Sequence, residues 1–280
     1  MTAGTDATGQ APSATTTSAD APARVTSSDD HPVGWVVVTG AAGGIGAAVV
    51  DRLLADGYGV VGVDIVEPEQ LPGVVHHAAQ DAAPPAPDAA TPDARVAWVS
   101  GDLTTPAGRD AVVAATDDRR LVGLVNVAGI TRDARLPNME DADVAAVLAV
   151  NAQAPLDLSL ALADRIVDGG AIVNISSRSH LGNFGQVNYS ASKGAIIGTT
   201  IAMSRSLAPR VRVNAIAPGL IATAMTEAMP DEVLAKITAK VPLGRAGRPE
   251  EVAAEVAHLL SPESSYTTGQ VAYPCGGRSC

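Results

Sequence analysis

The glycine-rich segment Thr39-Gly40-Ala41-Ala42-Gly43-Gly44-Ile45-Gly46 constrains the fold of this chain more than any other feature. An apolar run, Trp35–Val38, comes directly before it, and an amphipathic pattern that ends at Gly57 follows it. A strand, a glycine loop and a helix in this order are typical of a phosphate cradle. The glycines let the backbone approach a pyrophosphate, and the N-terminus of the helix offers unpaired N–H donors. A tight turn without a ligand is the alternative, and this context makes it the weaker one. The residues expected at the cofactor are Gly40, Gly44, Ile45 and Gly46.

A second strand is expected over Tyr58–Val63, and it ends at Asp64, 18 residues after Gly46. A carboxylate at this position accepts hydrogen bonds from the adenosine ribose and repels a 2′-phosphate. Between Val33 and Leu71 the only basic residue is Arg52, which falls inside the expected helix. The sequence therefore predicts NAD, not NADP, as the cofactor.

The rest of the chain alternates short apolar runs with helical patterns, which predicts a single α/β domain with a doubly wound parallel sheet (a Rossmann fold). Residues 220–242 contain two methionines and are expected to form a mobile helical flap. The further strands are expected at 96–100, 121–125, 171–175, 210–216 and 269–273, and the helices at 106–116, 141–163, 188–207 and 250–260.

Two segments do not fit a packed domain. Residues 1–31 are almost free of large apolar side chains, so we expect a disordered tail before a catalytic domain that covers 32–280. Residues 67–95 are rich in Pro and Ala and lack helical periodicity. We expect an irregular insertion there, in place of a crossover helix.

Composition excludes several functional classes. The net charge of −11 argues against nucleic acid or an anionic membrane as a partner. Cys275 and Cys280 are too few for a disulfide framework, and no Cys/His cluster has the spacing of a metal site. No apolar run approaches the roughly 18 residues that span a bilayer, and the N-terminus lacks the features of a signal peptide. A soluble cytoplasmic protein is expected.

Further cofactor contacts are expected where later strands end. Asp102 and Leu103 follow the third strand, and Asp102 either caps the next turn or touches the adenine edge. Asn126, Ala128 and Gly129 follow the fourth strand, where small residues let a cofactor lie against the backbone. The helix at 188–207 is apolar nearly all round, so it is buried either by the fold or by another subunit. This pattern predicts a homo-oligomer, a dimer or a tetramer.

Tyr189 and Lys193 are four residues apart at the start of this helix, so they share one face of it. A neighbouring ammonium lowers the pKa of a phenol, which could make Tyr189 a usable base near neutral pH. Two serines, Ser176 and Ser177, end the strand before it. The pair Tyr189 and Lys193 is weak evidence alone and gains weight from the glycine cradle.

From Val33 to Gly277 the chain resembles the short-chain dehydrogenases/reductases, most closely their 3-oxoacyl-carrier-protein-reductase-like branch. The resemblance implies a sheet of about seven strands. It also implies that Tyr189 exchanges a proton with the substrate and that Lys193 holds the nicotinamide ribose and lowers the pKa of Tyr189. The motifs that carry it are the glycine loop, Asn126-x-Ala128-Gly129, Asn151, the serine pair, Tyr189-x-x-x-Lys193 and Pro218-Gly219. The remaining implied roles are a substrate contact for one serine, a water site at Asn151, cofactor contacts at Pro218 and Gly219, and a carboxamide contact at Thr223.

The chain departs from the family pattern in the length of one loop, and this departure affects which serine is assigned as catalytic. The loop between the serines and Tyr189 is one residue short, so counting back from Tyr189 selects Ser176, whereas aligning the strand end selects Ser177. Neighbouring strand residues point to opposite faces, and a loop absorbs a deletion more easily than a strand changes register. We therefore expect Ser177 to be the catalytic serine.

These observations favour an NAD-dependent oxidoreductase that interconverts a secondary alcohol and a ketone, with a 3-hydroxyacyl thioester or an alicyclic alcohol as candidate substrates. The first alternative is an NADPH-dependent 3-oxoacyl-thioester reductase. The second is a cofactor-binding regulatory protein without turnover, for which Tyr189 and Lys193 would serve no purpose.

Overall fold

The computed structural model describes residues 33–66, 95–227 and 229–279. The expected tail at 1–31 and nearly all of the expected insertion at 67–95 lie outside the described residues, as does the expected loss of the crossover helix there.

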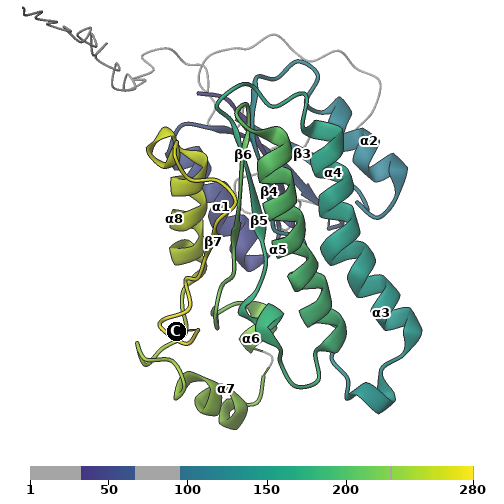
Figure 1. The fold of residues 1–280 in the computed structure, drawn as a ribbon, viewed down its shortest axis with the longest axis vertical. Helices are drawn as coiled ribbons and strands as arrows, with labels where there is room; N and C mark the ends of the chain where they lie inside the picture. Colours follow the sequence, from purple (N-terminus) through teal and green to yellow (C-terminus); the bar gives the residue numbers. More distant parts are fainter. Residues whose placement is uncertain (1–32, 67–94, 228, 280) are drawn as a thin grey trace, which may run out of the picture.

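The described residues contain a seven-stranded parallel sheet with the order β3-β2-β1-β4-β5-β6-β7 (Figure 1). The order reverses between β1 and β4, so the carboxyl ends of these two strands open a crevice. This is the predicted doubly wound fold. The strands are β1 Trp35–Thr39, β2 Gly59–Asp64, β3 Val96–Ser100, β4 Leu121–Asn126, β5 Ala171–Ile175, β6 Arg212–Ile216 and β7 Val271–Ala272.

Helices cover both faces of the sheet (Figure 1). Helices α1 (Gly44–Ala55) and α8 (Pro249–Leu260) pack together on one face. Helices α2 (Pro106–Ala114), α4 (Ala154–Leu162) and α5 (Val187–Leu207) cover the other. The expected flap contains two short helices at the end of the sheet where the strands finish. The remaining elements are α3 Asp141–Leu148, η4 Ala149–Gln153, α6 Ala224–Glu227, α7 Asp231–Thr238 and the short helices η3 Leu136–Asn138, η5 Arg178–Leu181 and η6 Pro262–Ser264.

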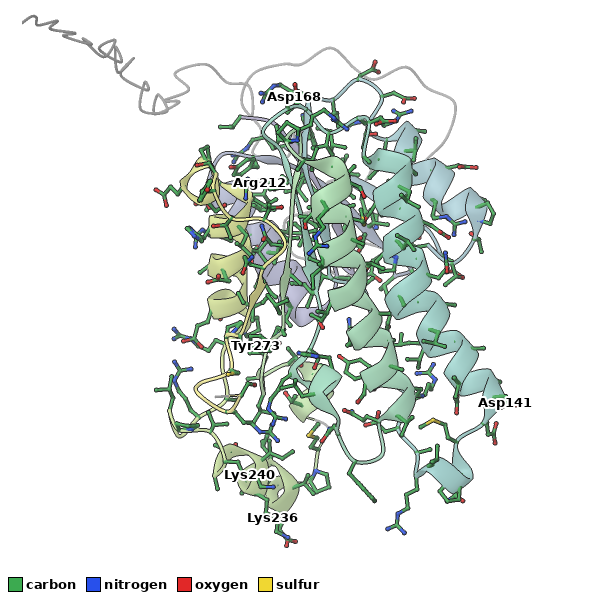
Figure 2. The ribbon with its side chains drawn as sticks, viewed as in Figure 1. Asp141, Asp168, Arg212, Lys236, Lys240 and Tyr273 are labelled. Carbon is green, nitrogen blue, oxygen red and sulfur yellow. The ribbon has the colours of Figure 1, made fainter. Side chains whose placement is uncertain are left out.

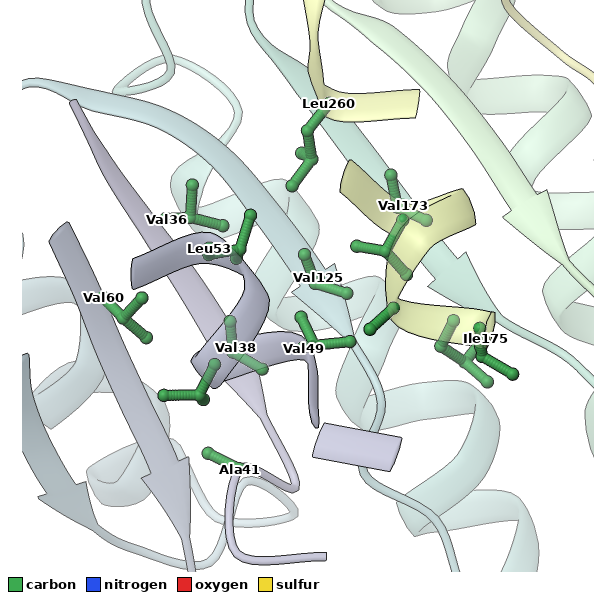
Figure 3. Packing of buried hydrophobic residues seen from close by; sticks show 14 of the residues in the cluster. Val36, Val38, Ala41, Val49, Leu53, Val60, Val125, Val173, Ile175 and Leu260 are labelled. Atoms are coloured by element: carbon green, nitrogen blue, oxygen red, sulfur yellow. The ribbon is translucent and has the colours of Figure 1, made fainter. Parts of the chain in front are cut away.

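The core forms two layers because successive strand residues face opposite sides of the sheet. Val36 and Val38 of β1 pack against Val49 and Leu53 of α1 (Figure 3). Val37, between them, faces the layer under α4, where it joins Leu158. The β-branched run is therefore buried on both faces, as expected for a central parallel strand.

The helix expected at 141–163 is present but interrupted. A π-helical turn, η4, separates α3 from α4 and contains Asn151. Pro155 follows it and has no N–H to continue the helical pattern. The stretch Asp141–Leu162 is long and apolar enough to cross a membrane by length and composition, in contrast to the expectation from apolar runs. Buried core helices pass the same test, and here Leu158 and Leu162 are fully buried in the core.

Helix α5 is covered on one side by the fold of the single chain. Its buried face is largely polar and includes Ser192, Lys193 and Thr200. Ile201 is 38% exposed, and Ala195 on the outer side is exposed as well. Of the two expected ways to bury this helix, the fold of one chain covers only the largely polar side and leaves small apolar residues on the outside.

Candidate active site

The site lies at the carboxyl ends of β1, β4, β5 and β6, where the glycine loop meets three other loops. Thr39, the last residue of β1, links two of these loops. Its Oγ1 accepts hydrogen bonds from the Val127 and Ala128 N–H groups at 3.1 and 3.2 Å. The glycine loop and the loop after β4 are therefore held side by side across the crevice.

The glycines of this loop are required by close packing. Gly40 has φ +65°, and a Cβ there would lie 2.8 Å from the Ala128 Cα. A Cβ on Gly46 would lie 1.9 Å from the Gly40 carbonyl oxygen. Thr223 lies over the loop, since its Cγ2 is 3.0 Å from the position of a Cβ on Gly44.

The N-terminus of α1 is free to bind an anion. Gly43 caps the helix without a side-chain hydrogen bond, and the first turn contains no acidic residue. Gly43 and Gly44 are exposed, while Ile45 and Gly46 continue the turn inward. The first N–H groups of a helix have no intrahelical partner, so this turn fits the pyrophosphate of a dinucleotide.

Asp64 is fixed beside the glycine loop at the end of β2. Its Oδ2 accepts a hydrogen bond from the Ala42 N–H at 3.0 Å, and its Oδ1 accepts one from the Ile65 N–H at 2.8 Å. A carboxylate oxygen has two lone pairs, so both oxygens can still accept bonds from ribose hydroxyls. Residues 39–46 and 64–66 contain no Lys or Arg that could pair with a 2′-phosphate.

Two residues expected to contact the cofactor, Asp102 and Asn126, use their side chains for hydrogen bonds within the protein. Asp102 caps a turn, because its Oδ1 accepts hydrogen bonds from the Thr104 N–H at 2.9 Å and the Thr104 hydroxyl at 2.7 Å. Leu103 follows it and is half-buried. Asn126 is buried, and its Nδ2 donates to the Asn174 Oδ1 of β5 at 2.8 Å. The turn-capping interpretation of Asp102 is therefore the one that the structure supports.

Asn151 joins the loop after β4 to helix α5. It is fully buried, and its amide exchanges two hydrogen bonds with the Ile130 backbone, at 2.8 and 2.9 Å. Its Nδ2 also donates to the Ser192 Oγ at 3.1 Å. A Cβ on Gly129 would lie 3.2 Å from the Asn151 Oδ1 and 3.3 Å from the Lys193 Nζ. The expected water site and the expected lysine thus converge at Gly129, where a larger residue would press on both.

Lys193 is buried one turn after Tyr189 on α5. Its Nζ donates a hydrogen bond to the Ile175 carbonyl at 2.9 Å and lies 5.7 Å from the centroid of the Tyr189 ring. Burial lowers the pKa of Lys193 to about 8. Lys193 is therefore mostly protonated at pH 7, and it loses its proton at a pH only slightly above neutral.

The pKa of Tyr189 is raised above its ordinary value, mainly by burial, and the Asp133 carboxylate adds to the increase. A side-chain hydrogen bond with Ser177 acts in the opposite direction. The predicted lowering of this pKa is wrong for the protein alone, because desolvation of the phenol outweighs the hydrogen bond with Ser177.

The two candidate serines point to different surroundings. Ser176 is buried, and its Oγ donates to the Lys193 carbonyl oxygen at 2.8 Å, which ties β5 to α5. Ser177 lies beside Tyr189, and its Oγ accepts a hydrogen bond from the Ser179 N–H at 3.1 Å. Only Ser177 places its hydroxyl next to the tyrosine hydroxyl.

A polar network that the sequence did not indicate holds the loop before α5. Gln186 Nε2 donates to Asp133 Oδ2 at 2.8 Å, and Gln186 Oε1 accepts from Asn183 Nδ2 at 2.7 Å. Asn188 Nδ2 donates to the Arg132 carbonyl oxygen at 2.9 Å. The loops after β4 and β5 are far apart in sequence, and no spacing pattern predicted that they pair.

The arrangement can bind a nicotinamide dinucleotide and move a proton. A bound nicotinamide cofactor would supply hydride transfer, while the chain supplies orientation and proton exchange. A carbonyl oxygen placed between Ser177 and Tyr189 would meet two hydroxyl groups. The buried Lys193 ammonium would add a positive charge that favours an oxyanion at this position.

Comparisons with known proteins agree with this geometry. A family model described as enoyl-(acyl carrier protein) reductase matches residues 40–279. The chain is 39% identical to a mouse (3R)-3-hydroxyacyl-CoA dehydrogenase over 253 residues, which cover 86% of this chain and 94% of the relative. It is also 39% identical to a 3-oxoacyl-(acyl-carrier-protein) reductase from Thermotoga maritima over 250 residues, 86% of this chain and 96% of that one.

Solved structures show the same fold. A blue fluorescent protein from a metagenomic library, in complex with NADPH, superposes with a TM-score of 0.77 at 28% identity, over 89% of this chain and 99% of that one. A short-chain dehydrogenase/reductase from Brucella melitensis superposes with a TM-score of 0.76 at 28% identity, over 89% and 98%.

Proposed function

Since the chain belongs to the short-chain dehydrogenase/reductase family, in its 3-oxoacyl-carrier-protein-reductase-like branch, and is an oxidoreductase of alcohols and ketones, we propose that it uses NAD(H) with Tyr189 as the acid/base. The observation that carries the choice of cofactor is Asp64, held by two backbone N–H groups beside the glycine loop. A 2′-phosphate there would meet a carboxylate and no basic side chain of the neighbouring loops. Steady-state rates with NADH and NADPH test this, and preference for NADPH would contradict it.

The residues have separate roles in this proposal. Ser177 donates a hydrogen bond to the substrate oxygen, and Tyr189 gives that oxygen its proton during reduction or takes it during oxidation. Lys193 holds the nicotinamide ribose and keeps a positive charge near the phenol. The supporting residues are Asn151, which positions a water beside Lys193, Pro218 and Gly219, which line the nicotinamide side, and Thr223, which contacts the carboxamide.

The raised pKa of Tyr189 supports this assignment for the reduction direction. A phenol that keeps its proton at neutral pH is ready to protonate the oxygen as hydride arrives. Oxidation needs the phenolate, so alkaline pH would favour it. The pH profiles of the two directions should therefore differ, with oxidation rising toward higher pH.

A second candidate function is reduction of a 3-oxoacyl thioester with NADPH. The names of the two relatives above favour a 3-oxoacyl or 3-hydroxyacyl thioester as the substrate, and one of the superposed structures is a complex with NADPH. Assays with acetoacetyl-coenzyme A and each reduced cofactor separate the candidates. Rapid reduction with NADPH and slow reduction with NADH would favour this second function.

We also propose that the protein is a homo-oligomer. Leu148 at the end of α3, Leu160 on α4 and Ile201 on α5 are 37%, 61% and 38% exposed. Helices α3 and α5 pack on each other, and Figure 1 shows α3, α4 and α5 on the same side of the sheet. A second copy would cover this layer, and light scattering that gives the mass of one chain would contradict the proposal.

A further inference from the structure

The hydroxyl of Ser177 is oriented by the short helix that follows it. Ser177 is the N-cap of η5, and its Oγ accepts a hydrogen bond from the Ser179 N–H at 3.1 Å. A hydroxyl has one proton and two lone pairs, whereas a backbone N–H can only donate. The Ser177 proton therefore points away from Ser179, and it remains free for an acceptor in the site.

Gln186 holds the side chain of Ser179 in turn. The Ser179 Oγ donates a hydrogen bond to the Gln186 Oε1 at 3.1 Å, and the Asn183 Nδ2 donates to the same oxygen at 2.7 Å. The Gln186 Nε2 donates to the Asp133 Oδ2 at 2.8 Å. An ionised carboxylate only accepts hydrogen bonds, so these three partners leave the Gln186 amide a single favourable orientation.

The backbone around Asp133 is fixed by two hydrogen bonds between the loop after β4 and the loop before α5. The Ala134 N–H donates to the Gly185 carbonyl oxygen at 2.9 Å. The Asn188 Nδ2 donates to the Arg132 carbonyl oxygen at 2.9 Å, and Asn188 is buried. Asp133 lies between these two bonds, so its carboxylate is a firm anchor although its side chain is exposed.

A continuous path of hydrogen bonds therefore joins the exposed carboxylate to the site. It begins at Asp133, passes through the Gln186 amide and the Ser179 side chain, and continues from the Ser179 N–H to the Ser177 Oγ. The path ends on the acceptor side of the Ser177 hydroxyl. A donor on that side strengthens the hydroxyl as a donor to its next partner, because hydrogen bonds in a chain polarise one another.

We propose that Gln186 is a positioning residue that directs the hydroxyl of Ser177 toward the substrate oxygen. Ser179 transmits this effect, and Asp133 anchors it. The proposal rests on the proposed function, because it assigns the substrate oxygen to Ser177. The effect of Gln186 belongs to the transition state, where the developing oxyanion needs a donor that is already oriented.

The experiment reverses the hydrogen bond between Gln186 and Asp133. Gln186→Glu places two carboxylates against each other, and neither of them can donate. Asp133→Asn alone keeps the bond, because its amide oxygen still accepts from Gln186. The two substitutions together restore the bond in the opposite direction, from the new amide to the new carboxylate. Gln153→Glu is the matched control, since the exposed Gln153 donates to the Asp157 Oδ1 at 2.6 Å outside this path.

Reduction of ethyl acetoacetate and of acetoacetyl-coenzyme A is measured with NADH and with NADPH. We expect Gln186→Glu to lower kcat by about 10- to 100-fold, below or near the loss of a whole oxyanion donor, with KM changed less than about threefold. The double variant should recover at least about a third of the wild-type kcat, and Asp133→Asn and Gln153→Glu should keep at least about half. An unchanged kcat in Gln186→Glu, or a double variant as slow as Gln186→Glu, would overturn the proposal.

The Kd for the reduced cofactor, from fluorescence titration, shows that each variant is folded and should stay within about threefold of the wild type. If Gln186→Glu does not fold, Asp133→Ala takes its place, because it removes the acceptor of the same bond. Its kcat should then fall by at least about threefold, whereas that of Asp133→Asn should not. Equal kcat values for these two variants would contradict the role of Asp133 as an anchor.

The Ser177→Ala background separates positioning from a general structural role. If Gln186 acts through the Ser177 hydroxyl, Gln186→Glu should lower the kcat of Ser177→Ala by less than about threefold, because the group that it directs is absent. A further loss as large as in the wild type would mean that the two residues act independently, and the proposal would be wrong.

The proposed function fails separately. If the wild type reduces neither substrate with either cofactor, amide hydrogen exchange of the Ser179 N–H is followed in protein labelled with ¹⁵N-serine. Exchange at least about tenfold faster in Gln186→Glu, and slowed again in the double variant, would support the path to Ser177 without any turnover. The same exchange rate in Gln186→Glu and wild type would overturn it.

Discussion

Ser176 and Ser177 are neighbours at the end of β5, yet their hydroxyl groups serve different parts of the molecule. Ser176 Oγ donates inward to the Lys193 carbonyl oxygen at 2.8 Å, whereas Ser177 lies against the Tyr189 side chain. Extended backbone turns successive side chains to opposite sides, so one serine serves packing and the other the site.

This relationship predicts opposite outcomes for two conservative substitutions. Ser177→Ala should lower kcat by about 100-fold or more, because it removes a donor to the developing oxyanion. Ser176→Ala should change kcat less than tenfold and instead lower the free energy of unfolding by about 1 kcal/mol, the typical value of one hydrogen bond. Steady-state kinetics and urea unfolding of both variants check this. The reverse order of kcat values would show that the shortened loop changes the strand register.

Asp64 predicts how cofactor preference can be altered. In Asp64→Ser the repulsion of a 2′-phosphate disappears, and kcat/KM for NADPH relative to NADH should rise at least tenfold. Asp64→Asn is the matched control for size and hydrogen bonding, since its amide oxygen can still accept from the Ala42 N–H. A rise in both variants would assign the effect to charge. If the ratio stays constant in both, Asp64 does not select the cofactor.

The lowered pKa of Lys193 should make the stability of the protein depend on pH. Its pKa is about 8 in the folded protein, and the unfolded chain keeps the ordinary value near 10.5. Between these values the unfolded state binds more protons, so the contribution of Lys193 to the free energy of unfolding rises as pH rises. The difference in stability between wild type and Lys193→Met should therefore shift in favour of the wild type by about 1–3 kcal/mol from pH 7 to pH 10.

Urea unfolding at several pH values measures this difference. Lys236→Met is the control, because Lys236 is 71% exposed. A difference between wild type and Lys193→Met that does not vary with pH would mean that Lys193 titrates normally.

We predict that replacing Arg212, which lies outside the candidate active site, strongly lowers the stability of the protein. Its guanidinium donates to the Leu259 and Leu260 carbonyl oxygens, at 2.8 and 3.2 Å, and so satisfies the last turn of α8 from strand β6 (Figure 2). Arg212→Met should lower the free energy of unfolding by about 2–5 kcal/mol, because buried carbonyls lose a charged donor. Thermal or urea unfolding checks it, with the exposed Arg205→Met as control. A loss below 1 kcal/mol would mean that water replaces the guanidinium.

Much of the fold could be predicted because its signals are local. The valines of β1 alternate between two core layers, and the glycines of the loop are those that the backbone contacts require. Fold class and family followed from such patterns, and the comparisons confirm both. The third strand was predicted with its exact bounds at 96–100.

What the sequence could not supply depends on contacts between distant residues. A periodicity of 3.6 residues does not reveal the π turn around Asn151. The raised pKa of Tyr189 depends on burial under loops that are paired by Asp133 and Gln186. The side of α5 that the sheet covers could not be predicted, because a helix that is apolar nearly all round does not distinguish its faces by hydrophobicity.

The central claim is that Tyr189 transfers the proton, and Tyr189→Phe tests it most directly. This substitution removes one hydroxyl and keeps the ring that lies near Lys193. We predict that kcat for ketone reduction with NADH falls by about 1,000-fold or more, within the range of lost acid–base catalysis and oxyanion stabilisation combined. The Kd for NADH, measured by fluorescence titration on the same preparation, should stay within threefold. A variant that keeps more than a tenth of the wild-type kcat would show that another group supplies the proton.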